Sequence, residues 1–251
     1  MSLNRSIHDP VFSPSDLALL DPEHIPHHIA IIPDGNRRWA TSKMLPTIKG
    51  HQAGYEQVVT IVRAAKELGI KVITLYAFST ENWKRSGSEV QSLMQLTLSY
   101  LANYQQKLVE ENIRLRAIGN LNLIPSGVKA ILDDTIDATK NCTEFDLVLG
   151  INYGGRDEIV RAVAKILAEK IDPKLITEKT ISEHLDTACW QDPDLIIRTS
   201  GERRLSNFLL WQSSYAEVYI ENVAWPDFSS QHLLQAVRDY QTRERRLGGR
   251  T

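Results

Sequence analysis

The sequence predicts a single α/β domain with a mostly parallel central sheet flanked by helices. Three observations support this prediction. Short apolar runs, typical of buried strands, alternate with longer segments whose apolar residues recur at helical spacing. The chain has 251 residues, enough for one large core. No linker, repeat or low-complexity stretch divides it, so we expect one domain over 28–251, preceded by a polar, proline-containing arm over 1–27.

The first half of the chain alternates strand-like and helix-like segments. The run HIAII at 28–32 is short and apolar, as buried strands are, and KVITLYAFS at 71–79 has the same character. Between them, residues 51–68 place apolar side chains on one helical face, which Gly69 closes. Residues 89–111 predict a longer helix that is rich in leucine.

The second half repeats this alternation. Its apolar or alternating runs predict strands at 113–119, 145–154, 194–201 and 217–222. The segments with helical spacing predict helices at 125–140, which begins with a proline, at 156–171 and at 229–246. Strands separated by helices of this length form βαβ units, so the predicted sheet is mostly parallel.

Composition and charge narrow the classes of protein. The formal net charge is −2, so no basic field indicates a nucleic-acid partner. The two cysteines, Cys142 and Cys189, lie far apart without metal-ligand spacing, which favours a reducing compartment. The sequence has neither a signal-peptide pattern nor an apolar run of about 18 residues. We therefore expect a cytoplasmic protein.

Polar residues gather behind three predicted strands, in PDGNRRW, STENWKRSGSE and RTSGERRLSN. The carboxyl ends of parallel strands share one edge of a sheet, where ligands bind. That edge would bring together Arg37, Arg38, Arg85, Arg198, Arg203 and Arg204. Arginine forks match phosphate oxygens, and glycines let backbone N–H groups approach an anion. The sequence therefore predicts a site for one or more phosphate groups.

Simpler interpretations exist for each residue taken alone. DGN is a common turn, Asp34 could cap the following helix, Trp83 could serve packing, His51 could stand at a helix start, and Glu217 could be an exposed strand residue. No P-loop, GxGxxG or GxSxG signature is present, which weighs against nucleotide binding and hydrolase triads. A sugar-phosphate or nucleotide-phosphate enzyme on a similar sheet and a membrane-docking scaffold remain as alternatives.

The longer motifs narrow this choice. IAIIPDGNRRWA, GHQAGYE, TLYAFSTENWKR, INYGGRDEIV, DLIIRTSGERRLSNFLLWQSSYAEVYI and WPDF resemble the cis-prenyltransferases, in particular the bacterial undecaprenyl diphosphate synthases, over about residues 25–248. The resemblance implies a homodimer that uses Mg²⁺ to condense isopentenyl diphosphate repeatedly onto an allylic diphosphate, typically farnesyl diphosphate. The expected product is undecaprenyl diphosphate, a lipid carrier for cell-wall synthesis. A shorter-chain synthase and a non-catalytic partner subunit are the alternatives within the family.

The resemblance also implies roles for individual residues. Asp34 would be catalytic and act with Mg²⁺, Asn82 would be tied to the condensation step, and Glu217 would be a second residue linked to Mg²⁺. The residues expected to bind substrate are Gly35, Asn36, Arg37, Arg38, Trp39, His51, Ser79, Thr80, Glu81, Trp83, Arg85, Arg198, Arg204, Ser206, Arg246 and Gly248. Of these, the 35–38 segment would cradle the allylic diphosphate, and Arg198, Arg204 and Ser206 would hold isopentenyl diphosphate. Arg246 and Gly248 would reach the site of the partner subunit.

Two positions depart from the family pattern. Pro33 stands where methionine is frequent, and Thr47 stands where many members have arginine, which predicts weaker allylic substrate binding. The base that removes the proton stays open among Asn82, His51 and a substrate phosphate oxygen. The growing chain implies an apolar tunnel, with the 89–111 helix as a wall and small Ala77 leaving room near the loop. A lipid product also implies transient contact with the inner face of the membrane.

Overall fold

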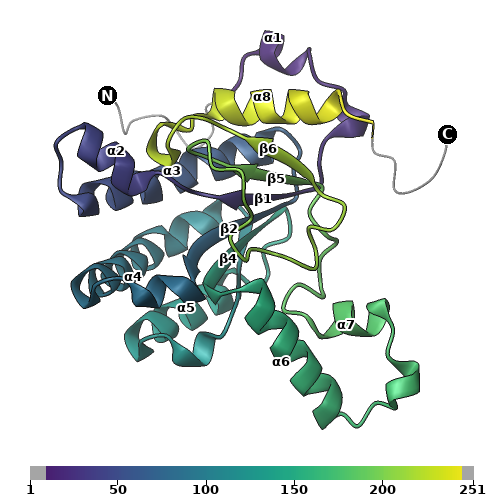
Figure 1. Cartoon of the computed structure of the whole chain (residues 1–251). Helices are drawn as coiled ribbons and strands as arrows, with labels where there is room; N and C mark the ends of the chain where they lie inside the picture. Colours follow the sequence, from purple (N-terminus) through teal and green to yellow (C-terminus); the bar gives the residue numbers. More distant parts are fainter. Residues whose placement is uncertain (1–9, 245–251) are drawn as a thin grey trace.

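The computed structural model describes residues 10–244, and its centre is a sheet of six parallel strands (Figure 1). The strands are β1 (His28–Ile32), β2 (Val72–Ser79), β3 (Ile113–Ile118), β4 (Phe145–Tyr153), β5 (Leu195–Arg198) and β6 (Glu217–Ile220). They lie in the order β3-β4-β2-β1-β5-β6, and every neighbouring pair is parallel. All six strands match predicted segments, so the α/β class and the parallel sheet are confirmed.

Five helices match predicted ranges, with shifted ends: α3 (Thr47–Glu67), α4 (Gly87–Glu110), α5 (Ser126–Thr139), α6 (Gly155–Ala168) and α8 (Ser230–Gln241). Helix α2 (Asn36–Ser42) follows Asp34, where the sequence suggested a helix but no range was predicted. Helix α3 begins at Thr47, not at residue 51, and Pro46 at its N-cap position has an extended backbone with ψ 142°. Helix α8 ends at Gln241, earlier than the predicted 246. Small α7 (Glu178–His184) was not predicted as a separate helix, and α1 (Pro14–Leu17) lies within the predicted N-terminal arm.

Short 3₁₀ turns complete the connections: η1 (Pro22–His24), η2 (Thr80–Lys84), η3 (Leu121–Leu123), η4 (Pro173–Leu175) and η5 (Trp225–Asp227). Of these, η2 matters most for function, because it directly follows the carboxyl end of β2.

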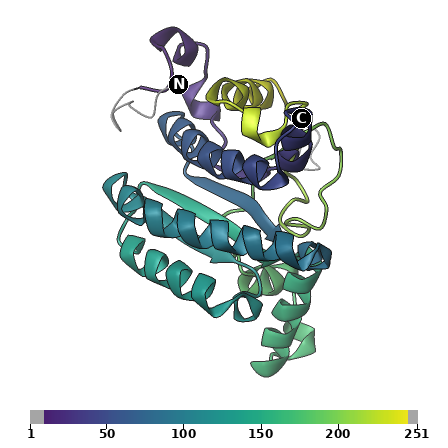
Figure 2. The same ribbon diagram turned by 90° about the vertical axis from the view of Figure 1, so that its left-hand side faces the viewer.

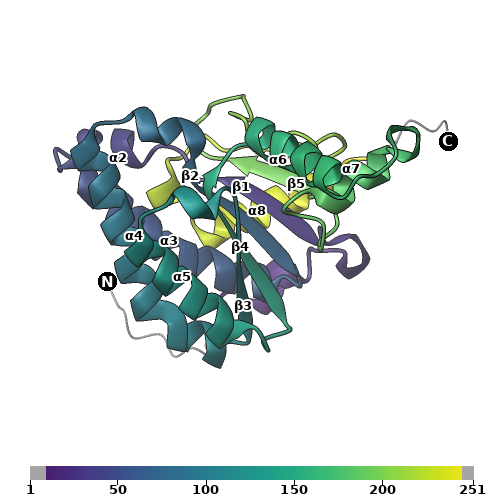
Figure 3. The same cartoon turned by 90° about the horizontal axis from the view of Figure 1, so that it is seen from below.

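The two faces of the sheet are covered differently. Alternate residues of β1 point to opposite faces, and Ile29 and Ile31 join a large core with α3, α4, α5 and α8. Ala30 and Ile32 join a smaller core with Phe208 and Leu209 of the long segment after β5. In Figure 2 the helices of the larger core lie in front of the sheet. Figure 3 shows α6 and α7 on the other side of the sheet. The layer with α3 and α4 covers the cavity that is described below.

The segment before β1 packs against the domain. Phe12 is only 3% exposed and belongs to the larger core. The backbone N–H groups of Val11 and Phe12 donate to the Glu67 carboxylate at the end of α3, at 2.7 and 2.9 Å. The residues from 10 to 27 therefore contribute to the fold, although the boundary at residue 28 stays a prediction. Among the described residues, no helix combines the length and apolar character that crossing a membrane requires.

Candidate active site

A cavity of about 770 Å³ opens at the carboxyl edge of the sheet and runs beneath α3 and α4. We call its polar opening the mouth; it is lined by Asp34, Asn36, His51, Ser79, Glu81, Asn82, Arg85, Arg198, Arg204, Ser206 and Asn207. We call the aliphatic part the body; its wall includes Val58, Val62, Leu93, Leu101, Leu115, Leu147, Leu149 and Ile151. The cavity reaches Ile113, the first residue of β3, and therefore extends along the strands to the amino edge.

Asp34 stands in a turn that is tied to two strands. Gly35 adopts φ +99°, and a Cβ there would lie 2.5 Å from Ser200 Oγ, so both the turn and its surroundings require glycine. The Gly35 N–H donates to Asp34 Oδ1 at 2.7 Å. Thr199, after β5, accepts from Asp34 N and donates to Asp34 O, both at 2.8 Å. Since Gly35 is the N-cap of α2, the Asp34 side chain stays directed to the mouth and does not cap this helix.

Arg198 is the main partner of Asp34. Its side chain is 5% exposed, and Nη2 donates to Asp34 Oδ2 at 2.7 Å. Its Nη1 donates to Ser206 Oγ at 2.8 Å and also to the Arg204 carbonyl oxygen. Burial raises the pKa of the Asp34 carboxyl, but the hydrogen bond and charge of Arg198 outweigh it, so the pKa is lowered overall. Asp34 is therefore ionised at neutral pH and paired with a buried guanidinium.

Three buried polar atoms at the mouth have no hydrogen-bond partner within the described protein: Asn36 Oδ1, His51 Nε2 and Arg198 Nε. His51 is 8% exposed, and its Nε2 lies 3.8 Å from Glu89 Oε1. Burial, together with the charge of Arg85, lowers the pKa of His51. Buried polar groups without partners are rare, and a bound polar ligand is one reason for them.

The loop after β2 presents its side chains in two directions. Asn82 Oδ1 accepts from Ser79 N at 3.1 Å, and Arg85 Nη1 donates to Glu89 Oε1 at 3.0 Å, both at the mouth. Trp83 is directed away from the cavity: its Nε1 donates to Asn152 Oδ1 at 2.7 Å, and its ring packs edge-on against Phe78. Trp83 therefore anchors the loop.

The sequence and the fold have counterparts among known proteins. The family model described as "Putative undecaprenyl diphosphate synthase" matches residues 32–248. An isoprenyl transferase of Heliobacterium mobile is 47% identical over 234 residues, which are 92% of this chain and 90% of that protein. An isoprenyl transferase of Shouchella clausii is 48% identical over 235 residues, 92% of this chain and 91% of that protein.

This chain belongs to the undecaprenyl diphosphate synthase family.

Solved structures agree with this assignment. Lavandulyl diphosphate synthase from Lavandula x intermedia, in complex with dimethylallyl diphosphate, superposes with a TM-score of 0.87 at 36% identity, covering 90% of this chain and 100% of that one. A probable undecaprenyl diphosphate synthase from Campylobacter jejuni has a TM-score of 0.77 at 32% identity, covering 89% and 99%. The protein is thus a prenyltransferase of the cis-prenyltransferase family.

Several residues expected from the family resemblance lie beside the cavity and not in its wall: Gly35, Arg37, Arg38, Trp39, Thr80 and Trp83. Arg38 still reaches Asp34, with 3.4 Å between Nη2 and Oδ1. Trp39 Nε1 donates to Asp227 Oδ1 at 2.8 Å, which fixes α2 to η5. Thr47 is the first residue of α3 and also lies outside the wall.

Glu217 is not brought to Asp34 within one chain. It is the first residue of β6 and pairs with Leu195 at the amino end of β5, whereas Arg198 ends β5 at the mouth. Its Oε2 accepts from Arg243 Nη1 at 2.8 Å. A link between Glu217 and the metal therefore finds no support in the geometry of this chain. Arg246 and Gly248 lie outside the described residues.

The side chains at the mouth fit a magnesium ion that is shared between the protein and a bound diphosphate. No group of three or more His, Cys, Asp or Glu side chains that could hold a metal occurs within residues 10–244. Asp34, with its side chain 29% exposed, is a carboxylate of the mouth that pairs with Arg198. Mg²⁺ commonly binds through one or two carboxylates, substrate phosphates and water, without an all-protein cage. Asp34 could therefore hold Mg²⁺ together with a bound diphosphate.

Sequence reasoning missed two groups of cavity residues. Asn207 follows Ser206 directly and lies at the mouth, a position that the motif RTSGERRLSN contained but that was not singled out. Tyr55, Tyr100 and Tyr104 also line the cavity, and their rings stack with centroids 4.8 and 5.7 Å apart. Their helical spacing resembles that of core residues, so only the space between α3 and α4 distinguishes them.

Proposed function

We propose that this protein condenses isopentenyl diphosphate repeatedly onto an allylic diphosphate, expected to be farnesyl diphosphate, and forms a long cis-polyprenyl diphosphate. The observation that carries the proposal is the continuity of one cavity from an arginine-rich mouth into an aliphatic body. Diphosphates match the mouth and a growing hydrocarbon chain matches the body. Undecaprenyl diphosphate is the proposed product.

The residues of the mouth suit the charges of this reaction. The C–O bond of the allylic diphosphate breaks, a C–C bond forms to isopentenyl diphosphate, and one proton leaves. Each diphosphate carries about three negative charges near neutral pH, so the two substrates repel each other unless cations lie between them. Arg198 and Arg204 would orient isopentenyl diphosphate, and the N-terminus of α2 with Arg37 and Arg38 would favour the allylic diphosphate.

Magnesium, held by Asp34 and substrate phosphates, would stabilise the charge that grows on the departing diphosphate. Asp34 is suited to this role because its lowered pKa keeps it ionised. Asn82 lies in the wall of the mouth, where it could orient the reacting diphosphate. His51, whose pKa is lowered by burial, is neutral at pH 7 and could accept a hydrogen bond through Nε2.

A homodimer is part of the proposal. Strand β6 is an edge strand with Val218 43% exposed, and α6 exposes Val160 and Leu167 at 67% and 68%. An unpaired strand edge and exposed apolar side chains are each typical of surfaces that associate. We expect light scattering to give twice the chain mass of 28.4 kDa, and Val160→Lys with Leu167→Lys to shift that mass toward the monomer.

The test of the function is a product ladder. The purified protein is incubated with farnesyl diphosphate, labelled isopentenyl diphosphate and Mg²⁺, with EDTA and Asp34→Asn as controls, and the extracted products are resolved by chain length. We expect incorporation that requires Mg²⁺ and ends near eleven isoprene units. A ladder that ends after a few units would identify a shorter-chain synthase, and no incorporation with any allylic primer would overturn the proposal.

A further inference from the structure

The segment that carries Arg204 and Ser206 has an unusual backbone. Ser200, Ser206, Asn207 and Leu209 all have positive φ, at 74°, 51°, 65° and 44°. Residues other than glycine rarely adopt this backbone conformation, and asparagine is among those that tolerate it best. Such a backbone persists only where surrounding contacts hold it in place. The contacts that hold this segment therefore help to set the geometry of the mouth.

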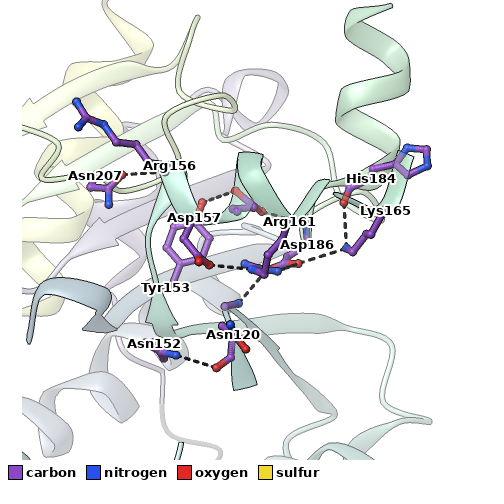
Figure 4. A network of polar contacts seen from close by, with 12 residues as sticks. Asn120, Asn152, Tyr153, Arg156, Asp157, Arg161, Lys165, His184, Asp186 and Asn207 are labelled. Carbon is purple, nitrogen blue, oxygen red and sulfur yellow. Dashed lines mark hydrogen bonds and ion pairs between the residues drawn. The ribbon is translucent and has the colours of Figure 1, made fainter. Parts of the chain in front are cut away.

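Asn207 makes these contacts to two other elements. Its Nδ2 donates to Glu81 Oε1 of η2 at 2.8 Å. Its Oδ1 accepts from Arg156 N at the start of α6 at 2.9 Å, as Figure 4 shows, and its carbonyl oxygen accepts from Gly155 N at 2.7 Å. One residue thus joins the segments that follow β2, β4 and β5.

The close approach of these segments depends on Gly154. A Cβ on Gly154 would lie 2.7 Å from Asn207 Nδ2 and 2.7 Å from Thr80 Oγ1. Any side chain here would push the segment after β5 away from η2. The glycine at the β4–α6 junction therefore makes room for the Asn207–Glu81 hydrogen bond.

We propose that Asn207 is a positioning residue, which holds the segment with Arg204 and Ser206 at a set distance from η2, which carries Asn82. Ser206 Oγ accepts from Arg198, and Arg198 pairs with Asp34, so a displaced residue 207 would also displace the groups that meet isopentenyl diphosphate. Glu81 then acts through Asn207 and not by touching substrate. This inference rests on the proposed function, since it assigns isopentenyl diphosphate to this segment.

An exchange of partners tests the proposal. Asn207→Asp can still accept from Arg156 N, but it sets a second carboxylate against Glu81. Glu81→Gln can still accept from Asn207 through its side-chain carbonyl oxygen, and its own kcat/KM is the reference for the double variant. In the double variant, the amide introduced at position 81 can donate to the carboxylate introduced at position 207, which restores the hydrogen bond with the roles reversed. Asn103→Asp, on the exposed face of α4, adds the same charge away from the mouth and serves as the control.

We expect Asn207→Asp to lower kcat/KM for isopentenyl diphosphate about tenfold or more, because small misplacements of substrate-binding groups cost rate. The double variant should return to within about threefold of Glu81→Gln. Asn207→Gly, which keeps the backbone conformation but has no side chain, should show the loss without rescue by Glu81→Gln. Unfolding curves establish which variants are folded.

Isopentenyl diphosphate binding, measured by calorimetry on the same variants, gives a second readout that needs no turnover. Loss in Asn207→Asp with recovery in the double variant supports the proposal. Wild-type behaviour of Asn207→Asp in both assays, or a double variant as impaired as Asn207→Asp, overturns it. If the wild-type protein transfers no prenyl group, the proposed function fails, whereas the binding cycle still decides the role of Asn207.

Discussion

The mouth and the body of the cavity are built from opposite kinds of residue. The mouth contains a buried ion pair, Asp34–Arg198, and three buried polar atoms without a partner in the described chain. The body is aliphatic, with side chains such as Val58, Leu101 and Leu147 facing an open space. Buried polar groups without partners and empty apolar space both lower stability in a resting protein. Each is reasonable where a ligand with a charged head and an apolar tail completes the packing.

This difference predicts that mouth variants change rate or affinity and body variants change product length. The largest effect is expected for Asp34→Asn, which removes the carboxylate and leaves Arg198 without its charged partner. Turnover should fall by a factor on the order of 10²–10³, the typical result of removing one group that stabilises a developing charge. Steady-state kinetics with saturating substrates measures it. Turnover within a factor of about three of the wild type would contradict the role of Asp34, provided that circular dichroism shows the variant folded.

Arg204 and Arg203 sharpen the comparison, since they are neighbours and Arg204 lines the mouth while Arg203 does not. Arg204→Ala should raise the KM for isopentenyl diphosphate about 10-fold to 100-fold, as the loss of a charge-assisted hydrogen bond of roughly 1.5–3 kcal/mol implies. Arg203→Ala is the matched control and should change this KM by less than about threefold, because Arg203 does not line the cavity and an exposed charge away from the ligand contributes little. Equal effects of the two substitutions would show that the loop acts only through its overall charge.

The body is tested by filling it. Val58 on α3 lines the cavity, so Val58→Trp should shorten the final product by two or more isoprene units while the first condensation keeps its rate within about twofold. Val109→Trp, on the solvent side of α4, is the control, because Val109 is 44% exposed and is not in the cavity wall. Products are compared by mass spectrometry. An unchanged distribution in Val58→Trp would count against the body as the chain-binding space.

A buried polar residue away from the cavity provides the reference. His28 is 1% exposed, with Nδ1 2.8 Å from Gln191 O and Nε2 2.8 Å from Thr74 Oγ1, and burial lowers its pKa to about 4. The unfolded chain takes up this proton near pH 6.5, so stability falls as pH drops from 6.5 toward 4, by about 1.4 kcal/mol per unit at most. Denaturant unfolding between pH 7.5 and 5 should show this slope, and His28→Gln should flatten it. The activity of His28→Gln at neutral pH should equal that of the wild type, because both ring nitrogens of His28 have hydrogen-bond partners within the protein and His28 does not line the cavity.

The sequence predicted the strands well because each is a short apolar run followed at once by polar residues. It also placed Asp34 and Arg198 at strand ends, but not beside each other. Those residues are 164 positions apart and meet because β1 and β5 are neighbours, which no local pattern encodes. Local patterns predicted a phosphate site at this edge, and the family resemblance added which diphosphate each residue is expected to bind.

Two further points could not be predicted from local patterns, for physical reasons. Glu217 lies in a recognisable motif, but its distance from Asp34 depends on the register of β6 against β5, which only the folded sheet defines. The tyrosines at 55, 100 and 104 have the spacing of core residues. Helical spacing indicates that a face is covered, but it does not show whether a neighbouring helix or an open cavity lies opposite.

The Asp34–Arg198 ion pair couples the two kinds of ligand that we expect at the mouth. While the pair is intact, each group neutralises the other, so neither a cation nor an anion meets a full charge. A diphosphate that draws Arg198 toward itself leaves Asp34 more negative and raises its affinity for a cation. Thermodynamic reciprocity then requires that the cation raises the affinity for the diphosphate by the same factor. We therefore expect metal and substrate to bind at the mouth cooperatively, and stray ions of either sign to occupy it poorly.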